Sequence, residues 1–393
     1  MKRETEKLYD LNAKLRTFQA HVLECIPKDD HFVIVLDRTA FYPEGGGQPA
    51  DKGVLNFANI LDVQEKEGVI YHISDRPVSV GTLVTGGIHW PRRFALMQQH
   101  TGEHIVSGLA HRLLGLDNVG FHMSDQFMTV DLNGTLSAND LELIERLANE
   151  AVWKNVPVKV WYPSAEELDR IPYRSKKRLT GKVRIVEIPG FDICACCGTH
   201  VSYTGEIGVI KLLSSQRYKG GTRLTMSCGA QALRNFSEKL TSVSAVSALL
   251  SAKPSEIQQA AEHMLKENSE LKRRLSALQS EVFQLKASAV PEGCGKILVF
   301  EDNLAPEQLR KFALTLSERC SAAAAVLSGN DTEGYRYAVA DTAQDVRPIA
   351  KELSSVFSAR GGGPKELVQG SVRGLQKDLT LFFEQKGFHS CKL

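Results

Sequence analysis

RRFALMQQHTGEHIVSGLAHRLLG, residues 92–115, carries apolar side chains at helical spacing. Leu96, Ile105 and Leu109 fall on one broad face. Gly115 is a residue typical of a helix end. The sequence therefore predicts a long helix, which separates a strand-rich beginning from a mixed α+β region.

Within this helix, the motif HTGEH places His100 and His104 four residues apart. Residues i and i+4 lie on the same helix face, so both imidazoles would point toward one place. That arrangement suits a metal ion, although such pairs also occur by chance. The motif differs from the HExxH of zinc proteases, because Glu103 directly precedes the second histidine and would point off the metal face.

A second pair of metal-ligand residues lies in CACCGTHV, where Cys196 and His200 are again four residues apart. Thiolate and imidazole are preferred zinc ligands, and four such side chains satisfy tetrahedral zinc. Cys194 and Cys197 are left as spare thiols or substitute ligands. The sequence therefore predicts one zinc ion, held by residues from two parts of one domain: His100, His104, Cys196 and His200.

Strand patterns dominate residues 1–90. HFVIVLD (31–37), GVLNFANILDVQ (53–64) and GVIYHIS (68–74) are rich in valine, isoleucine and aromatic residues and are bounded by turn residues. They predict a small antiparallel sheet or barrel. EGGGQPADKG (44–53) is typical of a glycine-rich loop, in which glycine permits positive φ and a close approach to a ligand.

Mixed helix and strand patterns then predict an α+β domain over residues 91–250. A highly charged region follows, in which leucines recur every seven residues from Leu271 to Leu285, as in a coiled coil. We therefore expect a helical or coiled-coil linker over residues 251–290. Alternating strands and helices over residues 291–393 predict a compact C-terminal α/β domain.

The composition is that of an ordinary globular protein, with 393 residues, 42% hydrophobic and 24% charged. Because the net charge is only +2, any nucleic-acid contact must come from local basic patches. The N-terminus MKRETEKLYDLNAKL has no apolar core, and no apolar run approaches the roughly 20 residues of a membrane span. We therefore expect a cytoplasmic protein without membrane contact, whose eight cysteines are reduced.

The two metal-ligand motifs together resemble the zinc site of the editing domain of alanyl-tRNA synthetases and of free-standing alanyl-tRNA editing proteins. The family pattern is His-x3-His, then Cys-Gly-Gly-Thr-His-Val, with Cys197 here replacing the first glycine. LDRTAFYPEGGGQPADKG (36–53) is similar to the glycine-rich stretch of the family's barrel. ARGGGPKELVQGSV (359–372) resembles the GGG loop of its C-terminal domain, the DHHA1 type also found in DHH phosphoesterases. Since no aminoacylation domain precedes the barrel, the chain resembles the long, free-standing form.

This resemblance implies hydrolysis of the wrong aminoacyl ester on alanine tRNA, chiefly the seryl ester, while the alanyl ester is spared. A synthetic pocket cannot strongly exclude an isostere that merely adds a hydroxyl, so about one error in 10² persists without editing. The editing site must therefore offer a hydrogen bond that only serine satisfies. By resemblance, Thr39 senses the serine hydroxyl and Gln48 belongs to the same pocket. The sequence leaves open whether the glycyl ester is also hydrolysed.

The expected partner is alanine tRNA mischarged with serine. We expect local basic side chains and the GGG loop to bind this tRNA. A homodimer through the coil or the C-terminal domain is left open. Zinc could orient the substrate or activate water, and His122 is a weak candidate for a general base. The residues expected to contact RNA are Arg92, Arg93, Arg174, Lys176, Lys177, Arg178, Gly361, Gly362 and Gly363.

Three other functions compete with this one. A threonyl-type editing domain carries a similar zinc motif, but the barrel stretch and the GTHV ending favour the alanyl type. A non-catalytic tRNA-binding protein would tolerate loss of metal ligands, and all four are present here. A DHH-type phosphoesterase needs aspartate and histidine motifs of a separate catalytic domain, which the sequence does not contain.

Overall fold

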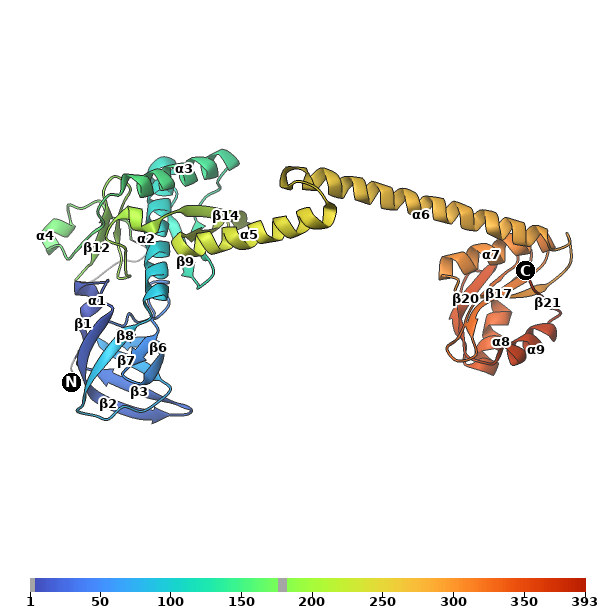
Figure 1. Ribbon diagram of the computed structural model, residues 1–393, viewed down its shortest axis with the longest axis horizontal. Coiled ribbons are helices and arrows are strands. Elements are labelled where there is room, and N and C mark those ends of the chain that lie inside the picture. The colour runs from blue at the N-terminus through green and yellow to red at the C-terminus, as the bar shows by residue number, and fades with distance from the viewer. Residues whose placement is uncertain (1–3, 176–181) are drawn as a thin grey trace. The chain divides into compact units, whose positions relative to one another are not determined.

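The computed structural model describes residues 4–175 and 182–393, and the chain divides into two compact units, Met1–Ala245 and Val246–Leu393 (Figure 1). The expected mixed α+β architecture with an N-terminal barrel is confirmed. The finer division into four domains stays a prediction. Three residues expected to contact RNA, namely Lys176, Lys177 and Arg178, lie outside the described residues.

Six antiparallel strands close the barrel in the order β2-β3-β7-β6-β5-β8. Buried side chains such as Ile34, Ile60 and Ile70 fill its interior, as the alternation along small barrel strands requires. The strands are β2 (Thr17–Lys28), β3 (His31–Leu36), β5 (Gly53–Leu55), β6 (Ala58–Lys66), β7 (Val69–Ser74) and β8 (Leu83–Ile88). A short parallel pair, β1 (Glu6–Lys7) with β4 (Arg38–Thr39), and the helix α1 (Leu8–Leu11) complete this region.

Two details of the barrel differ from the sequence-based expectation. Strand β2 has no predicted counterpart, because its alternation of buried and exposed side chains is interrupted by a register shift between Val22 and Glu24. The single strand expected over residues 53–64 is a hairpin. Asn56 turns the chain there with a φ of 53°, and asparagine is one of the few residues that tolerate this conformation.

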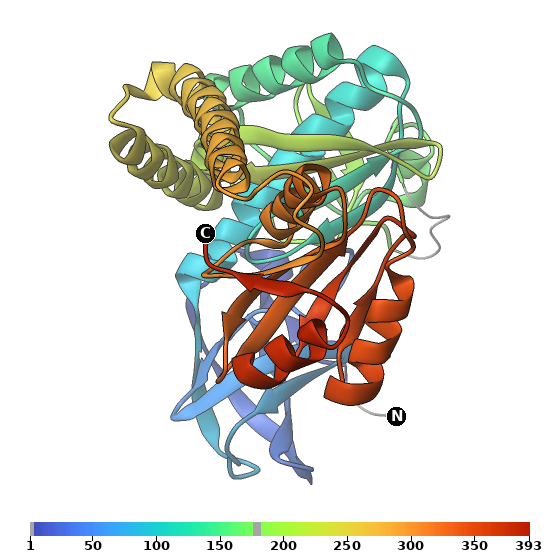
Figure 2. The same ribbon diagram turned by 90° about the vertical axis from the view of Figure 1, so that its right-hand side faces the viewer.

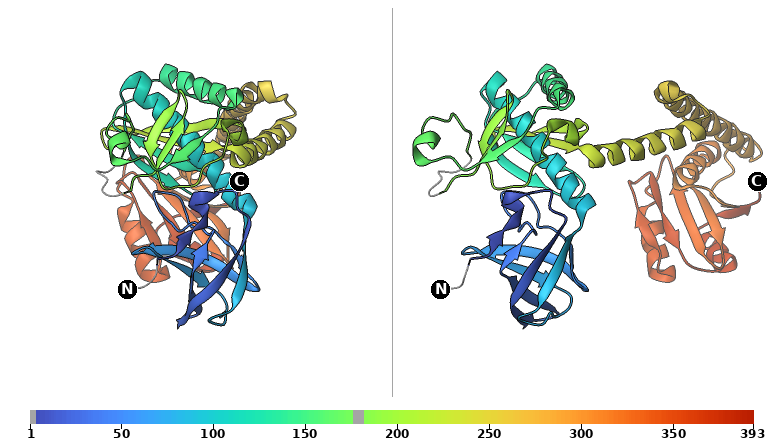
Figure 3. Two further views of the ribbon diagram at one scale, coloured as in Figure 1. Left: turned by 90° about the vertical axis from the view of Figure 1, so that its left-hand side faces the viewer. Right: turned by 60° about the vertical axis from the view of Figure 1, so that its left-hand side comes forward.

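Helix α2 (Trp90–Leu114) confirms the predicted long helix and forms the centre of the first unit (Figure 3). It begins with Pro91 in its first turn, where proline loses no helical hydrogen bond. It ends at Gly115, whose left-handed φ of 67° caps the last carbonyls. Nearly every side chain between Ala95 and Ala110 is buried, so this helix has no solvent face over that length.

Two sheets and further helices pack around α2, and their apolar side chains form one core cluster. The sheets have the orders β14-β15-β10-β9 and β11-β12-β13. The strands are β9 (Asn118–Met123), β10 (Met128–Leu132), β11 (Lys159–Trp161), β12 (Ile185–Ile188), β13 (Asp192–Ala195), β14 (Ile210–Tyr218) and β15 (Gly221–Cys228). The helices are α3 (Ala138–Lys154), α4 (Ala165–Leu168) and the 3-10 turn η1 (Thr204–Ile207), with α5 (Gly229–Leu250) leading away.

The second unit is built on a six-stranded sheet of order β19-β20-β18-β17-β16-β21 (Figure 2). One face packs its apolar side chains against α7 and the end of α6, and the other against α8 and α9. The strands are β16 (Ile297–Glu301), β17 (Ala324–Asn330), β18 (Gly334–Ala340), β19 (Arg360–Gly362), β20 (Leu367–Val372) and β21 (His389–Cys391). The helices are α6 (Ile257–Ser288), α7 (Pro306–Cys320), α8 (Arg347–Phe357) and α9 (Gln376–Glu384), with the 3-10 turn η2 (Pro254–Glu256) before α6.

Helix α6 contains the heptad leucines of the predicted coiled coil. Leu271, Leu278 and Leu285 are all more than half exposed, so no described residue covers them. A single long helix is observed, and its pairing with another helix stays a prediction. None of the helices in the described ranges combines the length and the apolar character needed to span a membrane.

Candidate metal centre and adjoining cavity

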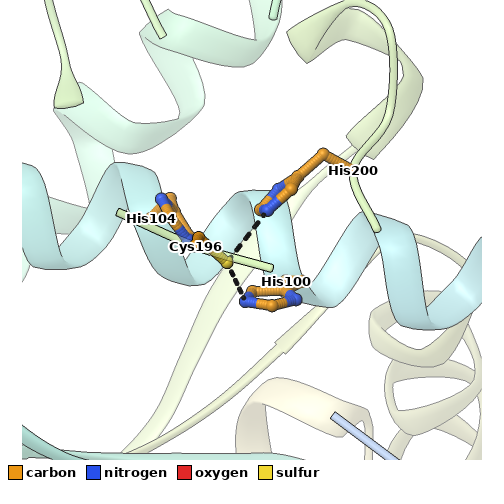
Figure 4. Close-up of side chains that lie close together, drawn as sticks. All are labelled: His100, His104, Cys196 and His200. Atoms are coloured by element: carbon orange, nitrogen blue, oxygen red, sulfur yellow. Dashed lines mark hydrogen bonds between the residues drawn. The ribbon is translucent and has the colours of Figure 1, made fainter. Parts of the chain in front are cut away.

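The four predicted metal ligands converge in the first unit (Figure 4). His100 and His104 come from successive turns of α2, while Cys196 and His200 come from the segment that follows β13. Their ligand atoms all lie within 4.8 Å of one another. Cys196 Sγ is 3.4 Å from His100 Nε2 and 3.5 Å from His200 Nε2.

These separations fit a shared tetrahedral ion. With Zn–S near 2.3 Å and Zn–N near 2.0–2.1 Å, tetrahedral geometry places sulfur and nitrogen about 3.5 Å apart. The donor set of one thiolate and three imidazoles is also one that zinc prefers. The described residues therefore fit one zinc ion in both chemistry and spacing.

Hydrogen bonds at the far ring nitrogens orient all three histidines. His100 Nδ1 lies 2.9 Å from Gln48 Oε1, and His104 Nδ1 lies 2.9 Å from Asp192 Oδ2. His200 Nδ1 lies 3.2 Å from the hydroxyl of Thr101. Because that hydroxyl donates to the carbonyl of Met97, it accepts the bond from His200. Each Nδ1 is thus a donor, which leaves Nε2 with the lone pair that a metal requires.

Gln48 links the barrel to this centre. Its Oε1 also accepts a hydrogen bond from the backbone N–H of Thr199, and its Nε2 donates to the Thr199 hydroxyl. The side-chain amide is therefore fixed in one orientation. The structure places Gln48 behind His100, as a positioning residue that is itself fully buried.

Gly198 and Arg184 fix the conformation of the ligand loop, residues 196–200. A Cβ added at Gly198 would lie 2.1 Å from His100 Cε1, so only glycine fits there. Arg184 donates to the carbonyls of Cys196 and Gly198 at 2.8 and 2.9 Å. Cys197, which stands where the family pattern has a glycine, is exposed.

Electrostatics favour a thiolate at Cys196. Burial opposes ionisation, but the neighbouring His100 and His104 outweigh it and hold the pKa of the thiol well below its usual range. Burial lowers the pKa of His200 to about 3, so that ring stays neutral. Cys194 behaves differently, because burial raises its pKa to about 11 and keeps it a thiol. The pKa of His104 is held well above its usual range, because Cys196 and Asp192 outweigh the burial that opposes its charge. Zinc binds a thiolate and neutral imidazoles, so its binding would release the proton from this ring.

Arg174 belongs to this support network. Its guanidinium binds both oxygens of Asp192, at 2.7 and 3.0 Å, and Asp192 in turn accepts from His104. The side chain of Arg174 is only 13% exposed. The sequence-based expectation for this arginine is a contact to RNA, but the structure uses it to hold the carboxylate that orients a metal ligand.

The expected RNA contact of Arg93 is wrong. Its side chain is fully buried, and its guanidinium binds the Asp51 carboxylate and the carbonyls of Ala13 and Ala40. It therefore joins α2 to the barrel and cannot reach a phosphate. The guanidinium of Arg92 also has protein partners, because it donates to the carbonyl of Ala50 and pairs with Asp125. Only 15% of the Arg92 side chain is exposed.

Thr39 does not lie where the resemblance implied. Its hydroxyl is fully buried in the barrel, accepts from the N–H of Phe41 and lies 2.9 Å from His72 Nε2. His72 Nδ1 donates to the carbonyl of Ile34, so the Thr39 hydroxyl donates to Nε2. The donor of the hydroxyl and one of its two acceptor lone pairs are therefore used inside the barrel. Thr39 is not among the described residues that line the cavity beside the metal centre.

That cavity has a volume of about 530 Å³, within the range of small-molecule sites. Besides the ligands His100, His104 and Cys196, its lining includes Glu103 and Phe121. Glu103 is not part of the ligand cluster, but it lines the same cavity as His100 and His104. His122, the weak base candidate, is exposed and does not line it.

The second unit has a larger hollow, of about 850 Å³, next to the GGG segment. Strand pairing sets Ser328, Arg336, Ser371 and Arg360 in one row across β17, β18, β20 and β19. Arg373 lines the same hollow, and Glu333 is the one carboxylate among the described residues that line it.

The expected GGG loop is wrong in detail, because these residues form the edge strand β19 and its approach to β20. A Cβ at Gly361 would lie 2.4 Å from the carbonyl of Gln369, and one at Gly363 would lie 2.1 Å from that of Leu367. Gly362 has open space around it. The two outer glycines are therefore explained by close packing of the chain on itself rather than by a ligand.

Comparison with known proteins adds family relationships. The family "Threonyl and Alanyl tRNA synthetase second additional domain" matches residues 183–225, which include Cys196 and His200. The family "tRNA synthetases class II (A)" matches residues 5–92, the barrel region.

Two curated relatives match almost the whole chain. The alanyl-tRNA editing protein AlaX-L of Pyrococcus horikoshii is 29% identical over 396 residues, which cover 95% of this chain and 96% of that protein. The alanine–tRNA ligase of Pyrococcus furiosus is 32% identical over 405 residues, covering 98% of this chain and 44% of the ligase. The chain thus spans less than half the length of that ligase. A crystal structure of the C-Ala domain of Aquifex aeolicus alanyl-tRNA synthetase matches 23% of the chain and 87% of that domain, at 18% identity and a TM-score of 0.21.

Proposed function

Because the chain is similar to an alanyl-tRNA editing protein over nearly its whole length, we propose that it belongs to that family and is an aminoacyl-tRNA deacylase that hydrolyses Ser-tRNA(Ala) and spares Ala-tRNA(Ala). The observation that carries the proposal is the cluster His100, His104, Cys196 and His200, opening onto a cavity of about 530 Å³. Metal-assisted ester hydrolysis needs both a ligand set of this kind and a concave space beside it.

A zinc ion held by the four ligands would supply Lewis-acid polarisation of the ester carbonyl. The residues behind the ligands keep the site rigid, since Gln48 fixes the ring of His100 and Asp192 fixes that of His104. Phe121 stacks on His100 with ring centroids 5.4 Å apart, and its ring forms an apolar wall of the cavity. Such a wall limits the water that surrounds the ester.

Selection of serine over alanine requires a polar group that meets the serine hydroxyl. We place this requirement on the polar residues that line the cavity rather than on Thr39, whose hydroxyl is already bonded within the barrel. Whether Gly-tRNA(Ala) is hydrolysed depends on the same groups, because glycine also lacks the hydroxyl.

Contacts with tRNA are assigned to basic residues that remain exposed. Lys182 is exposed and borders the cavity. In the second unit, Arg336, Arg360 and Arg373 are exposed and line one hollow, so they offer several guanidinium groups to phosphate oxygens. The exposed leucines of α6 provide an apolar face for a homodimer. Light scattering measures the mass in solution, and the mass of a monomer would contradict this dimer.

A second candidate is hydrolysis of Ser-tRNA(Thr). The matched family is shared by threonyl- and alanyl-tRNA synthetases, which keeps this substrate under consideration. The match of the barrel region and the near-complete overlap with AlaX-L favour the alanyl substrate.

The deciding experiment follows release of labelled amino acid from Ser-tRNA(Ala), Gly-tRNA(Ala), Ala-tRNA(Ala) and Ser-tRNA(Thr), with Cys196→Ala as the inactive control. Fast release from Ser-tRNA(Ala), slow release from Ala-tRNA(Ala) and loss of both in the variant would support the proposal. Faster release from Ser-tRNA(Thr) would favour the threonyl candidate. If all four tRNAs are bound but none is hydrolysed by the zinc-loaded protein, the chain is a tRNA-binding protein instead.

A further inference from the structure

Cys294 and Cys320 bring two thiols into contact in the second unit. Their sulfur atoms lie 3.1 Å apart, although 26 positions separate the two residues in the sequence. Both are free thiols, and neither belongs to the candidate metal centre or lines the cavity beside it. The pair therefore has no part in the function proposed above.

The backbone holds these two side chains next to each other. Cys294 lies in the segment between α6 and β16, and Cys320 is the last residue of α7. The N–H of Gly293 donates to the carbonyl of Arg319 at 3.2 Å, so the residues just before the two cysteines are hydrogen-bonded to each other. The guanidinium of Arg319 also donates to the carbonyl of Val290. The closeness of the sulfurs thus follows from the positions of the two backbone segments.

The turn that carries Cys294 also favours one orientation. Gly293 and Gly295, on either side of it, have φ of 68° and 86°, left-handed values that glycine adopts without steric cost. Cys294 is half-buried, whereas Cys320 is 1% exposed and belongs to an apolar core cluster. A small reagent therefore meets the sulfur of Cys294 first.

A disulfide accounts for this pair better than a metal ion does. A bond between the two sulfurs requires a separation of about 2.05 Å, so they must approach by about 1 Å, which small rotations of the side chains supply. A zinc site needs three or four protein ligands, and the described residues offer no third ligand to this pair. Burial also raises the pKa of Cys320 to about 12, which disfavours the thiolate that a metal requires.

We propose that Cys294 and Cys320 form a modification site, at which a small-molecule disulfide such as oxidised glutathione is exchanged for a disulfide between the two residues. The thiolate of Cys294 attacks the reagent, whose S–S bond breaks, and one thiolate leaves. The sulfur of Cys320 then attacks the mixed disulfide and displaces the second thiolate. The two departing thiolates take up the protons that the cysteines lose. One reagent disulfide is thus reduced to two thiols, and two protein thiols are oxidised to one disulfide.

The new bond stabilises the second unit. It closes a loop that contains β16 and α7, and it restricts the unfolded chain more than the folded one. For a loop of this length, the temperature midpoint of unfolding of the second unit should rise by roughly 5–15 °C.

The test follows each cysteine of the second unit in its own tryptic peptide. Cys294, Cys320 and Cys391 fall in residues 287–296, 320–336 and 387–392, so every pairing gives a distinct mass. The reduced full-length protein is equilibrated with mixtures of reduced and oxidised glutathione, quenched, alkylated, digested and analysed by mass spectrometry. The test variants are Cys294→Ser and Cys320→Ala. Cys391→Ser, a change at a thiol that packs against the same apolar cluster, is the matched control.

Thermal unfolding of the two units is separated by tryptophan. All three tryptophans, Trp90, Trp153 and Trp161, belong to the first unit, so tryptophan fluorescence follows that unit alone. Calorimetry detects both units, and the transition that fluorescence does not detect belongs to the second.

In the wild-type protein and in Cys391→Ser, oxidising mixtures should link residues 287–296 to residues 320–336, and dithiothreitol should reverse the link. The midpoint of the second unit should rise as stated, while the fluorescence midpoint stays unchanged. Cys294→Ser and Cys320→Ala should show neither the link nor the shift. Because Cys294 is half-buried, its variant tests the pair even where loss of the buried Cys320 prevents folding.

Glutathione that stays attached to Cys294, or a link from either residue to Cys391, would overturn the proposal. Two free thiols in the most oxidising mixture, or a link that forms only in denaturant, would also overturn it. An unchanged or lowered midpoint in protein that carries the link would refute the stabilising effect.

Discussion

Gln48 Oε1 lies 2.9 Å from His100 Nδ1, so a loop of the barrel holds a ligand that belongs to the long helix α2. The distance in sequence between the two residues is 52 positions. The metal centre is therefore shared between the barrel and the structure that follows it.

The first prediction tests this hydrogen bond. Gln48→Ala should weaken zinc binding by about 10- to 100-fold, because partners behind a ligand commonly contribute that much to metal affinity. Competition with a chelator of known affinity measures the change. Gln19→Ala, at an exposed position of β2, is the control. Equal zinc affinity in the two variants would show that the hydrogen bond has no role in metal binding.

The second prediction concerns Thr39. Thr39→Val should lower the free energy of unfolding by about 1–3 kcal/mol, because His72 Nε2 loses its donor inside the barrel. The ratio of seryl to alanyl hydrolysis should stay unchanged. Denaturant unfolding and the deacylation assay measure the two effects, with the exposed Thr85→Val on β8 as the control. Lost discrimination in a fully folded Thr39→Val protein would restore Thr39 as the sensor of the serine hydroxyl.

The third prediction concerns the buried pair of Arg93 and Asp51. Arg93→Met should destabilise the first unit by about 3–5 kcal/mol, because it leaves the Asp51 carboxylate buried without its partner. The double variant with Asp51→Asn should recover part of that loss. Arg38→Met, which removes the exposed pair with Glu6, should change stability by less than about 1 kcal/mol. Matching losses for Arg93→Met and Arg38→Met would contradict the structural role.

The fourth prediction is a pH dependence at His72. Burial lowers its pKa from 6.5 to about 4, so the unfolded chain binds the proton more readily than the folded one. The stability contributed by the neutral ring is complete above pH 6.5 and is lost as the pH falls toward 4. Between pH 7 and 4.5 the loss should be about 2–3 kcal/mol. Unfolding of metal-free wild-type protein and His72→Gln at both pH values isolates this effect, and an equal pH dependence of the two would refute it.

The fifth prediction concerns the arginines of the second unit. Replacing Arg336, Arg360 and Arg373 with glutamine should weaken tRNA binding, because fewer phosphates are then neutralised. Its salt dependence should fall by about 0.7–0.9 in log–log slope for each phosphate that the variant no longer binds. Binding titrations at several salt concentrations measure both quantities, with the exposed Arg310→Gln on α7 as the control. An unchanged slope would place the RNA-binding residues elsewhere.

The sequence predicted the barrel, the helix over residues 92–115 and the convergence of two motifs that are far apart along the chain. Periodicity and ligand spacing are local patterns, and a zinc site adds a chemical constraint that links them. The structure brings His100, His104, Cys196 and His200 together as that constraint required.

Other features depend on burial, which the sequence does not encode locally. Arg93 and Arg174 have the appearance of phosphate-binding residues until their carboxylate partners, Asp51 and Asp192, come near in the fold. Helical spacing alone turns Glu103 away from the metal, on a helix that has no solvent-facing side there. Thr39 is assigned to the pocket by resemblance alone, and its partner on β7 becomes visible only once the barrel closes.

The hydrogen bonds that cross from barrel to α2 have a practical consequence for anyone who divides the protein. A fragment that begins near residue 90 would separate Arg93 from Asp51 and His100 from Gln48. Such a fragment would contain all four candidate metal ligands, but the Arg93 guanidinium would lack its carboxylate and the ring of His100 would lack its hydrogen-bond partner. Transfer of the candidate metal centre into another scaffold therefore requires the barrel as well.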